Sequence, residues 1–418
     1  MNLFERRGGE LFCEEVPLAR LARRFGTPLY VYSAGTLRRH ARVFREAVRG
    51  LGRAEPLCCF AVKACGNLAV LSLLRREGFG FDIVSAGELL RALRAGARPD
   101  RIVFSGVGKR EDELRAALDA GILQFNCESE EELRQLSRVA RSLGKTAEVA
   151  VRVNPDVDAR THPYIATALA TSKFGIPAAR ARAAYRLIAA LPGLRAQGLA
   201  CHIGSQISQV RPFVEAARKL RALFLALRED GHALTRLDLG GGLGVPYRDA
   251  DEPATPAAYG RALAGALRGL DVQLLFEPGR LIVANAGLLL SRVILTKQGE
   301  GARRFAVIDA GMNDLLRPAL YQAEHAVEPV VEAAGRKRRI DVVGPVCESA
   351  DVFTKQRMMT ALAAGDLVAI RSAGAYGMSM ASSYNARPRP AEVLVDGARA
   401  RLVRERETLE ALLDGETI

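Results

Sequence analysis

Eight short apolar runs alternate with longer amphipathic stretches up to residue 280, and this alternation constrains the fold more than any other feature of the chain. The runs are LCCFAVKA (57–64), GFDIVSA (80–86), RIVFSGVG (101–108), ILQFNCES (122–129), EVAVRVNP (148–155), LRAQGLACHIGS (194–205), LTRLDLGGG (234–242) and DVQLLFEPGR (271–280). Runs of this length suit buried strands, and the stretches between them carry Leu and Ala at helical spacing. Repeated strand and helix units predict an α/β fold built on a parallel (β/α)₈ barrel of the TIM type, with an open doubly wound sheet as the alternative.

The pattern changes after residue 283. Segments such as RFAVIDA, RKRRIDVVGPV and AEVLVDG follow one another without long helices between them, which is typical of antiparallel strands. We therefore predict a barrel over residues 29–283 and a C-terminal antiparallel β-rich domain over 284–418. Residues 1–28 precede the barrel, and we expect the segment ELFCEEV to contribute a strand to the β domain.

Composition excludes several classes of protein. The net charge is +13, but the arginines are spread through helical segments, Trp is absent and no basic tract is interleaved with aromatic residues, so we predict no nucleic-acid partner. No apolar run is long enough to span a bilayer, and the charged start MNLFERRGGE does not resemble a signal peptide, so we predict a cytoplasmic protein without a membrane partner. The seven scattered cysteines contain no CxxC pair, which argues against a disulfide framework and against a structural metal site.

Polar residues and glycines gather where the predicted strands end. They are Lys63, Ser85, Gly106, Ser129, Asn154, His202, Gly240 to Gly242, and Glu277. Each of them taken singly is compatible with an ordinary turn. Because barrels of this type keep their active sites at the carboxyl ends of the strands, we predict that these residues surround one site.

The chemistry of these residues points to one cofactor. Lys63 follows an apolar run, and apolar surroundings favour the neutral amine that can form a Schiff base with an aldehyde. The triple glycine at 240–242 lets backbone N–H groups approach a phosphate. Glu277 supplies a carboxylate, Arg280 a nearby cation and His202 a flat ring. Together these groups are suited to pyridoxal 5′-phosphate, with the carboxylate pairing with the pyridine nitrogen.

The motifs around these residues resemble a known family. FAVKACGN (60–67) resembles the YAVKAN segment of fold-type III pyridoxal-phosphate decarboxylases, and the chain as a whole resembles the diaminopimelate decarboxylase family among them. The motifs that carry the resemblance are RVNPDVDARTHPYIATALATSKFGI (152–176), HIGSQI (202–207), DLGGGLGVPY (238–247), FEPGR (276–280), RPALY (317–321), VVGPVCESADVF (342–353) and RSAGAYGMSMASSYNARPRPAEVLVDG (371–397). They run through most of the chain.

The resemblance implies the decarboxylation of meso-2,6-diaminopimelate to L-lysine and CO₂, the last step of lysine biosynthesis. It implies that Lys63 holds the cofactor, that Glu277 contacts the pyridine nitrogen and that His202 lies against the ring. It also implies that Cys347 donates the proton and that Cys347 and Glu348 serve the partner subunit of a homodimer with shared active sites.

The resemblance further implies the remaining contacts of the site. The cofactor would be contacted by Lys63, His202, Ser205, Gly241, Gly242, Glu277, Arg280 and Tyr376. The amino-acid substrate would be bound by Arg280, Arg317, Tyr321, Glu348 and Tyr376. A cation and an anion at Arg317 and Glu348 complement the distal carboxylate and amine of such a substrate.

Two positions depart from the family pattern, and three other functions stay open. Phe60 and Cys65 stand where the family usually has Tyr and Asn, so the hydrogen bonds of those groups are lost or replaced. The alternatives are a related decarboxylase of ornithine, arginine or lysine, an amino-acid racemase on the same barrel, and a pyridoxal-phosphate carrier. A carrier would leave residues 284–418 without an explanation.

Overall fold

The chain forms two compact units. The computed structural model describes residues 2–158, 173–248, 250–301 and 303–418, so that residues 159–172 of the motif at 152–176 lie outside the described residues. We call the two units the barrel unit and the β unit. The barrel unit comprises His40–Val245 and Glu252–Leu281, and the β unit comprises Met1–Arg39, Pro246–Asp251 and Ile282–Ile418.

Eight parallel strands close the barrel. They are β5 (Leu57–Ala61), β6 (Gly80–Ile83), β7 (Ile102–Phe104), β8 (Gln124–Cys127), β9 (Ala147–Asn154), β11 (Leu194–Ala200), β12 (Arg236–Asp238) and β13 (Gln273–Phe276). Each strand pairs in parallel with the next, and β13 pairs with β5, so the sheet has no free edge. The short β10 (Ile176–Pro177) adds a pairing to β9. The predicted barrel is confirmed, and the open doubly wound alternative is wrong.

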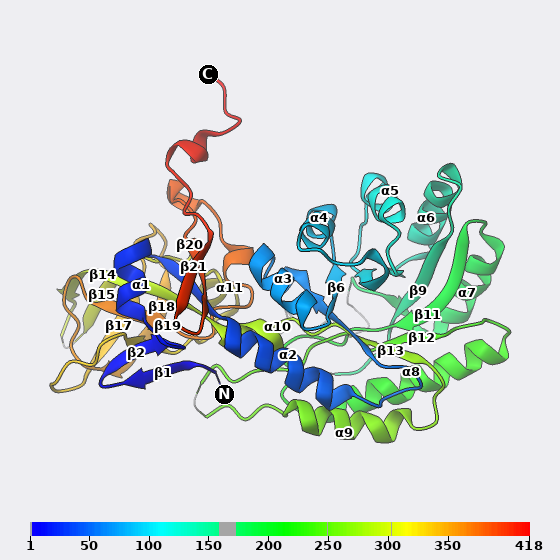
Figure 1. Ribbon diagram of the computed structural model, residues 1–418, viewed down its shortest axis with the longest axis horizontal. Coiled ribbons are helices and arrows are strands. Elements are labelled where there is room, and N and C mark those ends of the chain that lie inside the picture. The colour runs from blue at the N-terminus through cyan, green and yellow to red at the C-terminus, as the bar shows by residue number, and fades with distance from the viewer. Residues whose placement is uncertain (1, 159–172, 249, 302) are drawn as a thin grey trace. The chain divides into compact units, whose positions relative to one another are not determined.

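Helices alternate with these strands. They are α3 (Leu68–Arg76), α4 (Ala86–Arg94), α5 (Glu111–Ala120), α6 (Glu130–Ser142), α7 (Ala181–Ala190), α8 (Arg211–Glu229) and α9 (Pro256–Leu267). Figure 1 shows α4, α5, α6 and α7 following one another along the outside of the strands. Ser85 and Ser129 accept hydrogen bonds from the backbone N–H groups of Glu88 and Glu132, and so each begins a helix directly after a strand. None of the helices in the described ranges is both long and apolar enough to cross a membrane.

A mostly antiparallel sheet forms the centre of the β unit. Its strands are β4 (Leu29–Ser33), β14 (Gly287–Gln298), β15 (Arg304–Ile308), β16 (Val327–Pro329), β17 (Arg338–Val343), β18 (Val352–Met359), β19 (Leu367–Ile370), β20 (Ala391–Asp396) and β21 (Arg399–Arg404). β4 lies between β14 and β20, antiparallel to the first and parallel to the second. β15 and β17 are also parallel. The predicted β-rich C-terminal domain is confirmed in its class, and β4 supplies a central strand from the other end of the chain.

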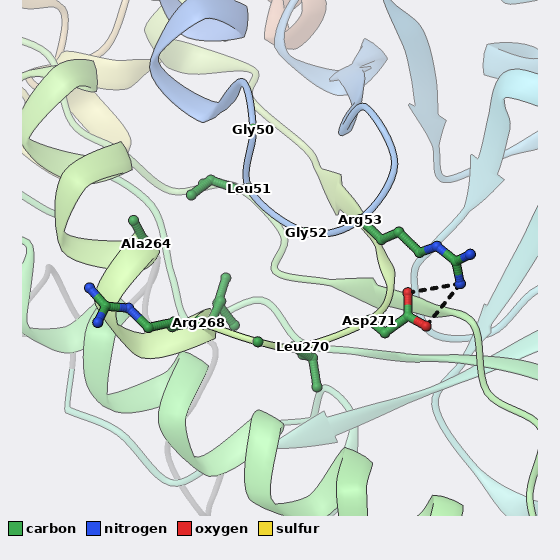
Figure 2. Close-up of a pocket in the computed structure, with 10 residues that line it drawn as sticks. Gly50, Leu51, Gly52, Arg53, Ala264, Arg268, Leu270 and Asp271 are labelled. Atoms are coloured by element: carbon green, nitrogen blue, oxygen red, sulfur yellow. Dashed lines mark hydrogen bonds and ion pairs between the residues drawn. The ribbon is translucent and has the colours of Figure 1, made fainter.

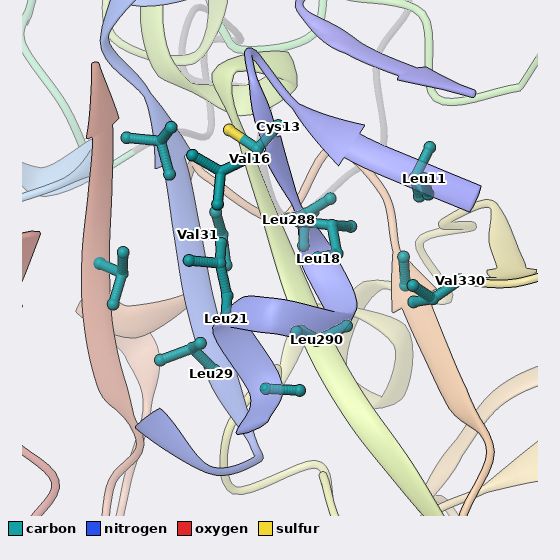
Figure 3. Close-up of a cluster of buried hydrophobic side chains, with 14 of the residues drawn as sticks. Leu11, Cys13, Val16, Leu18, Leu21, Leu29, Val31, Leu288, Leu290 and Val330 are labelled. Atoms are coloured by element: carbon teal, nitrogen blue, oxygen red, sulfur yellow. The ribbon is translucent and has the colours of Figure 1, made fainter. Parts of the chain in front are cut away.

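The N-terminal segment packs on this sheet. The strands β1 (Phe4–Arg7), β2 (Glu10–Cys13) and β3 (Val16–Pro17) form a small antiparallel sheet, and α1 (Leu18–Phe25) follows directly. Leu11, Leu18, Leu288 and Leu290 belong to one cluster of buried side chains, all four are fully buried, and Figure 3 shows Leu18 beside Leu288 of β14. Removing these apolar side chains from water stabilises the association of the N-terminal segment with the sheet.

Gly260 in α9 provides a test of the helix packing in the barrel unit. A Cβ atom at Gly260 would lie 1.8 Å from the carbonyl oxygen of Ala47 in α2 (Ala34–Val48). The two helices are therefore so close that any side chain at position 260 would clash with the backbone of α2. We expect Gly260→Ala to lower the free energy of unfolding by about 1–3 kcal/mol, because the helices must separate. Urea denaturation measures this change.

The same helix offers the control. A Cβ atom at Gly265 would meet no atom within 4 Å. Gly265→Ala should therefore raise stability by up to about 1 kcal/mol through helix propensity alone. Equal urea midpoints for the two variants would show that the close approach of α9 to α2 does not limit packing.

Candidate active site

Four of the predicted positions follow neighbouring strands of the barrel. Lys63 lies in a short 3₁₀ turn directly after β5, and Glu277 follows β13. Gly240 to Gly242 come two residues after β12, and His202 comes two residues after β11. Because β11, β12, β13 and β5 are consecutive neighbours in the barrel, these residues share the carboxyl end of one side of it.

Lys63 is paired with a buried carboxylate. Its Nζ lies 2.9 Å from Oδ2 of Asp82, whose side chain is fully buried, whereas the lysine side chain remains 36% exposed. Asp82 comes from β6 and stands in register with Ala61 of β5, two residues before Lys63. The sequence predicted apolar surroundings for this amine, and the structure places a buried carboxylate beside it. The pairing fixes the position of the amine at the end of the barrel.

Glu277 is a buried carboxyl group that accepts hydrogen bonds from two side chains. Its Oε1 accepts from Ser105 Oγ and from Asn126 Nδ2, both at 3.2 Å. Burial raises the pKa of Glu277 well above its usual value, and the neighbouring Asp238 and Asp82 raise it further, while Lys63 acts in the opposite direction. A positively charged group placed beside it, such as a protonated ring nitrogen, would favour its ionised form.

The glycines after β12 permit a close approach of three backbone segments. A Cβ atom at Gly241 would lie 2.1 Å from the carbonyl oxygen of Glu277, and one at Gly242 would lie 2.3 Å from that of Gly204. Gly242 also has a φ of +112°, which side-chain-bearing residues rarely adopt. Only glycine fits at these two positions, and the resulting bare backbone can approach an anion.

Arg280 and Ser205 form the charged part of this region. The buried Arg280 donates to Ser205 Oγ from Nη2 at 3.0 Å and from Nε at 3.2 Å. A guanidinium, a hydroxyl and backbone N–H groups are the donors that a phosphate requires. The residues present therefore fit pyridoxal 5′-phosphate: an amine for the aldehyde, a carboxyl group for the ring nitrogen and a cationic cradle for the phosphate.

His202 is held in one tautomer. Its Nδ1 accepts a hydrogen bond of 3.1 Å from the N–H of Gly241, so the proton of the neutral ring lies on Nε2. Removal from water lowers the pKa of His202 well below its usual value, and the positive charges of Arg152 and Lys63 lower it further. The ring is neutral and fixed against the glycine segment.

Four buried partners of these residues were not predicted from the sequence. Asp82 and Asp238 are fully or almost fully buried, as are Ser105 and Asn126. A signal was present, because Asp82 and Asp238 are charged residues inside runs that are otherwise apolar. Buried carboxylates in such positions mark functional sites.

The other predicted residues belong to the β unit. Arg317 begins α11 (Arg317–Tyr321), and its Nη1 lies 2.9 Å from Nε2 of the buried His325. The guanidinium of Arg317 also lies over the ring of Tyr247, 4.6 Å from its centre. Tyr321 is the last residue of the helix and is half-buried. These contacts fix the direction of the Arg317 side chain, which is buried except for a few per cent of its surface.

Cys347 and Glu348 lie on an exposed loop that two neighbouring side chains hold. The N–H of Cys347 donates to Asn385 Oδ1 at 2.8 Å, and the hydroxyl of Tyr384 donates to Glu348 Oε2 at 3.1 Å. Cys347 is exposed, whereas the other six cysteines are buried. Tyr376 is half-buried and adopts a φ of +56°, an uncommon conformation for a residue with a large side chain.

Two cavities lie away from the predicted residues. One, of about 420 Å³, is lined by residues of the loops that precede β5 and β13, such as Gly52 and Arg268. It therefore lies at the amino ends of these strands. Figure 2 shows the ion pair of Arg53 and Asp271 at its border. The other, of about 1080 Å³ in the β unit, is lined in part by His325 but by none of the predicted substrate residues. Neither cavity is the predicted site.

Comparison with known proteins agrees with the geometry. Residues 34–284 match the family described as "Pyridoxal-dependent decarboxylase, pyridoxal binding domain". A diaminopimelate decarboxylase of Pseudomonas aeruginosa is 52% identical over 418 residues, covering 100% of this chain and 99% of that protein. The crystal structure of diaminopimelate decarboxylase from M. jannaschii in complex with L-lysine has a TM-score of 0.94 at 36% identity and covers 99% of this chain and 98% of that one. The lysine/ornithine decarboxylase of Vibrio vulnificus, with a TM-score of 0.80 at 24% identity over 91% of this chain and 97% of that one, shares the fold.

The environment of His202 predicts a pH dependence of stability. The lowered pKa means that the folded protein excludes a proton that the unfolded chain takes up below about pH 6.5. The contribution of this histidine to stability should thus be complete above that pH and should fall as the pH is lowered through it. Urea midpoints from pH 8 to pH 5 should decline less steeply for His202→Gln than for the unmodified protein. Parallel declines would show that His202 binds a proton in the folded state.

Proposed function

The chain belongs to the diaminopimelate decarboxylase family of pyridoxal-dependent decarboxylases, and from this membership we propose that it converts meso-2,6-diaminopimelate to L-lysine and CO₂. The observation that carries the proposal is an identity of 52% to a diaminopimelate decarboxylase over the full length of both chains. The paired Lys63 and Asp82 and the buried Glu277 at the carboxyl end of the barrel support it independently.

Lys63 is proposed to hold pyridoxal 5′-phosphate covalently through its amine. When bound, the cofactor supplies an electron sink for the electron pair that remains when the substrate carboxylate departs as CO₂. Asp82 orients the amine and accepts its hydrogen bond. A carboxylate at this position can also take a proton from the amine when the lysine acts as a nucleophile.

Glu277 and His202 are proposed to act on the ring of the cofactor. The carboxylate of Glu277 would accept a hydrogen bond from the protonated ring nitrogen, and its negative charge would keep the proton there. The neutral imidazole of His202 would lie against the ring and exclude water from it. Because Gly241 fixes Nδ1, the imidazole keeps one orientation.

The phosphate is proposed to bind at the glycine segment. Arg280 and Ser205 would donate from their side chains and Gly242 from the backbone, while Gly241, whose N–H donates to His202, would contact the cofactor without donating to the phosphate. Tyr376 is proposed as a further contact of the cofactor. Three segments of the barrel unit would thus bind the phosphate dianion, and the buried guanidinium of Arg280 would compensate part of its negative charge.

We propose that the site binds both ends of the substrate. Arg317 would bind the distal carboxylate and Glu348 the distal amine, and Arg280, Tyr321 and Tyr376 would complete the contacts. Specificity for a substrate with two amino-acid ends requires such a fixed cation and anion, because a shorter or simpler diamino acid leaves one of them unpaired. The rival activity on ornithine, arginine or lysine lacks a use for Arg317.

Cys347 is proposed to donate the proton that completes L-lysine. We further propose a homodimer in which Cys347 and Glu348 of one subunit serve the site of the partner subunit. The exposure of Cys347 in the single chain supports this role, since most free cysteines are buried. The seven free cysteines also support a reducing compartment, and we propose the cytoplasm.

Lys63→Ala should abolish the visible absorbance of the bound cofactor, because no amine then remains to bind its aldehyde. A spectrum of the purified variant after incubation with pyridoxal 5′-phosphate measures this. Lys145→Ala, which removes a surface ion pair of 2.7 Å with Asp119 and a hydrogen bond of 3.1 Å to the carbonyl oxygen of Leu118, should keep the absorbance. A coloured Lys63→Ala protein would contradict the assignment of the lysine.

Cys347→Ala should retain the absorbance and lose at least ~100-fold in kcat, since a positioned proton donor contributes on this scale. The assay is release of lysine and CO₂ from meso-diaminopimelate. A racemase would give no CO₂, and a carrier would not respond to the substitution. Faster release of CO₂ from ornithine, arginine or lysine than from meso-diaminopimelate would favour the rival decarboxylases.

A further inference from the structure

Asp238 is a buried carboxyl group to which the proposed mechanism assigns no role. It is the last residue of β12 and only 1% exposed. Its Oδ1 accepts a hydrogen bond of 2.9 Å from the N–H of Gly240, which begins the glycine segment. Its Oδ2 accepts one of 3.1 Å from Asn126 Nδ2. Both oxygens of Asp238 are therefore fixed, one by the segment that follows β12 and the other by β8.

Asn126 joins Asp238 to Glu277. The Nδ2 atom of Asn126 carries two hydrogens, but it has three acceptors within reach: Asp238 Oδ2 at 3.1 Å, Ser105 Oγ at 3.1 Å and Glu277 Oε1 at 3.2 Å. Its Oδ1 accepts from Gln124 Nε2 at 2.9 Å, so the amino group faces the two carboxyl groups. One nitrogen thus lies within 3.2 Å of both Asp238 and Glu277, and its hydrogens cannot satisfy all three acceptors.

Two full negative charges in this position would be costly. Like charges a few ångströms apart and out of water repel strongly, and such carboxyl pairs usually bind one proton in common. A third carboxylate, Asp82, adds to the negative charge, and its compensating cation is Lys63. The buried thiols of Cys59 and Cys201 interact electrostatically with both carboxyl groups, and burial raises the pKa of both thiols above the usual range.

We propose that Asp238 and Glu277 hold one proton between them and form a single monoanion, with Asp238 as the residue that positions Glu277. The assignment of Glu277 to the cofactor ring rests on the proposed function, whereas the shared proton rests on the contacts alone. The pair would present one negative charge to a protonated ring nitrogen, so that the charges balance. Burial raises the pKa of both carboxyl groups, in agreement with a retained proton.

The proton can be observed directly by infrared difference spectroscopy on the full chain without cofactor at about pH 9. Glu88 and Asp314, whose pKa values are raised to about 7, are ionised at that pH and do not interfere. The unmodified protein should show the carbonyl stretch of a protonated carboxyl group that is missing in Asp238→Asn. The amide matches a protonated carboxyl group in shape and leaves Glu277 as the single anion.

Two further variants complete the measurement. Glu277→Gln should lose the same band, because Asp238 is then the single anion, so the test does not depend on one variant that folds. Ser105→Ala removes a neutral donor to Glu277 at 3.2 Å and should keep the band. A band that persists in both Asp238→Asn and Glu277→Gln, or a spectrum of the unmodified protein without any such band, would overturn the shared proton.

Cofactor binding separates positioning from a purely structural role. Asp238→Asn should bind pyridoxal 5′-phosphate within about threefold of the unmodified affinity, because the charge of the pair is unchanged, whereas Asp238→Ala should weaken binding at least ~10-fold. Equal affinities of these two variants would refute the positioning role of Asp238. Failure of the unmodified protein to bind the cofactor would instead refute the proposed function and leave the infrared result standing.

Discussion

Closure of eight parallel strands into a barrel is the constraint on which the other features depend. In an open sheet the strands β13 and β5 would lie at a distance set by the intervening chain, whereas closure makes them hydrogen-bonded neighbours. Residues 63 and 277, more than two hundred positions apart in the sequence, then follow adjacent strands. Every parallel strand ends at the same side, so the polar residues that follow β5, β11, β12 and β13 must share a limited space.

That space contains more ionisable groups than were predicted from the sequence, and each of those named here has a hydrogen-bonding partner. Lys63 faces Asp82, Arg280 donates to Ser205, and Glu277 shares the amide of Asn126 with Asp238. A buried ionised group without a partner costs several kcal/mol, so each group restricts the choice of its neighbour. The site is therefore a network in which changing one ionisable residue alters the protonation of the next.

The fold could be predicted from the sequence because hydrophobic periodicity is a local property, and each of the eight predicted runs coincides with one barrel strand, although β9 begins one residue before its run. Lys63 and Glu277 could be predicted because they end such runs. Asp82 and Asp238 could not, since their roles depend on which strands are neighbours and in which register, such as Asp82 opposite Ala61. The hydrogen bond from the N–H of Cys347 to Asn385 was not predicted for a similar reason. The two residues are 38 positions apart, and no periodicity links their loops. Where the pairing of distant segments determines the environment of a side chain, a single sequence does not contain the information needed to predict its partners.

The central position of β4 in the sheet of the β unit has a consequence for synthesis on the ribosome. β4 leaves the ribosome early, but its two neighbours, β14 and β20, begin at residues 287 and 391. The apolar strand LYVYS must wait for most of translation, while the whole barrel unit between them can already fold. Nascent chains stalled before β20 would carry an unpaired, aggregation-prone strand edge near their amino terminus, which is a natural target for a chaperone.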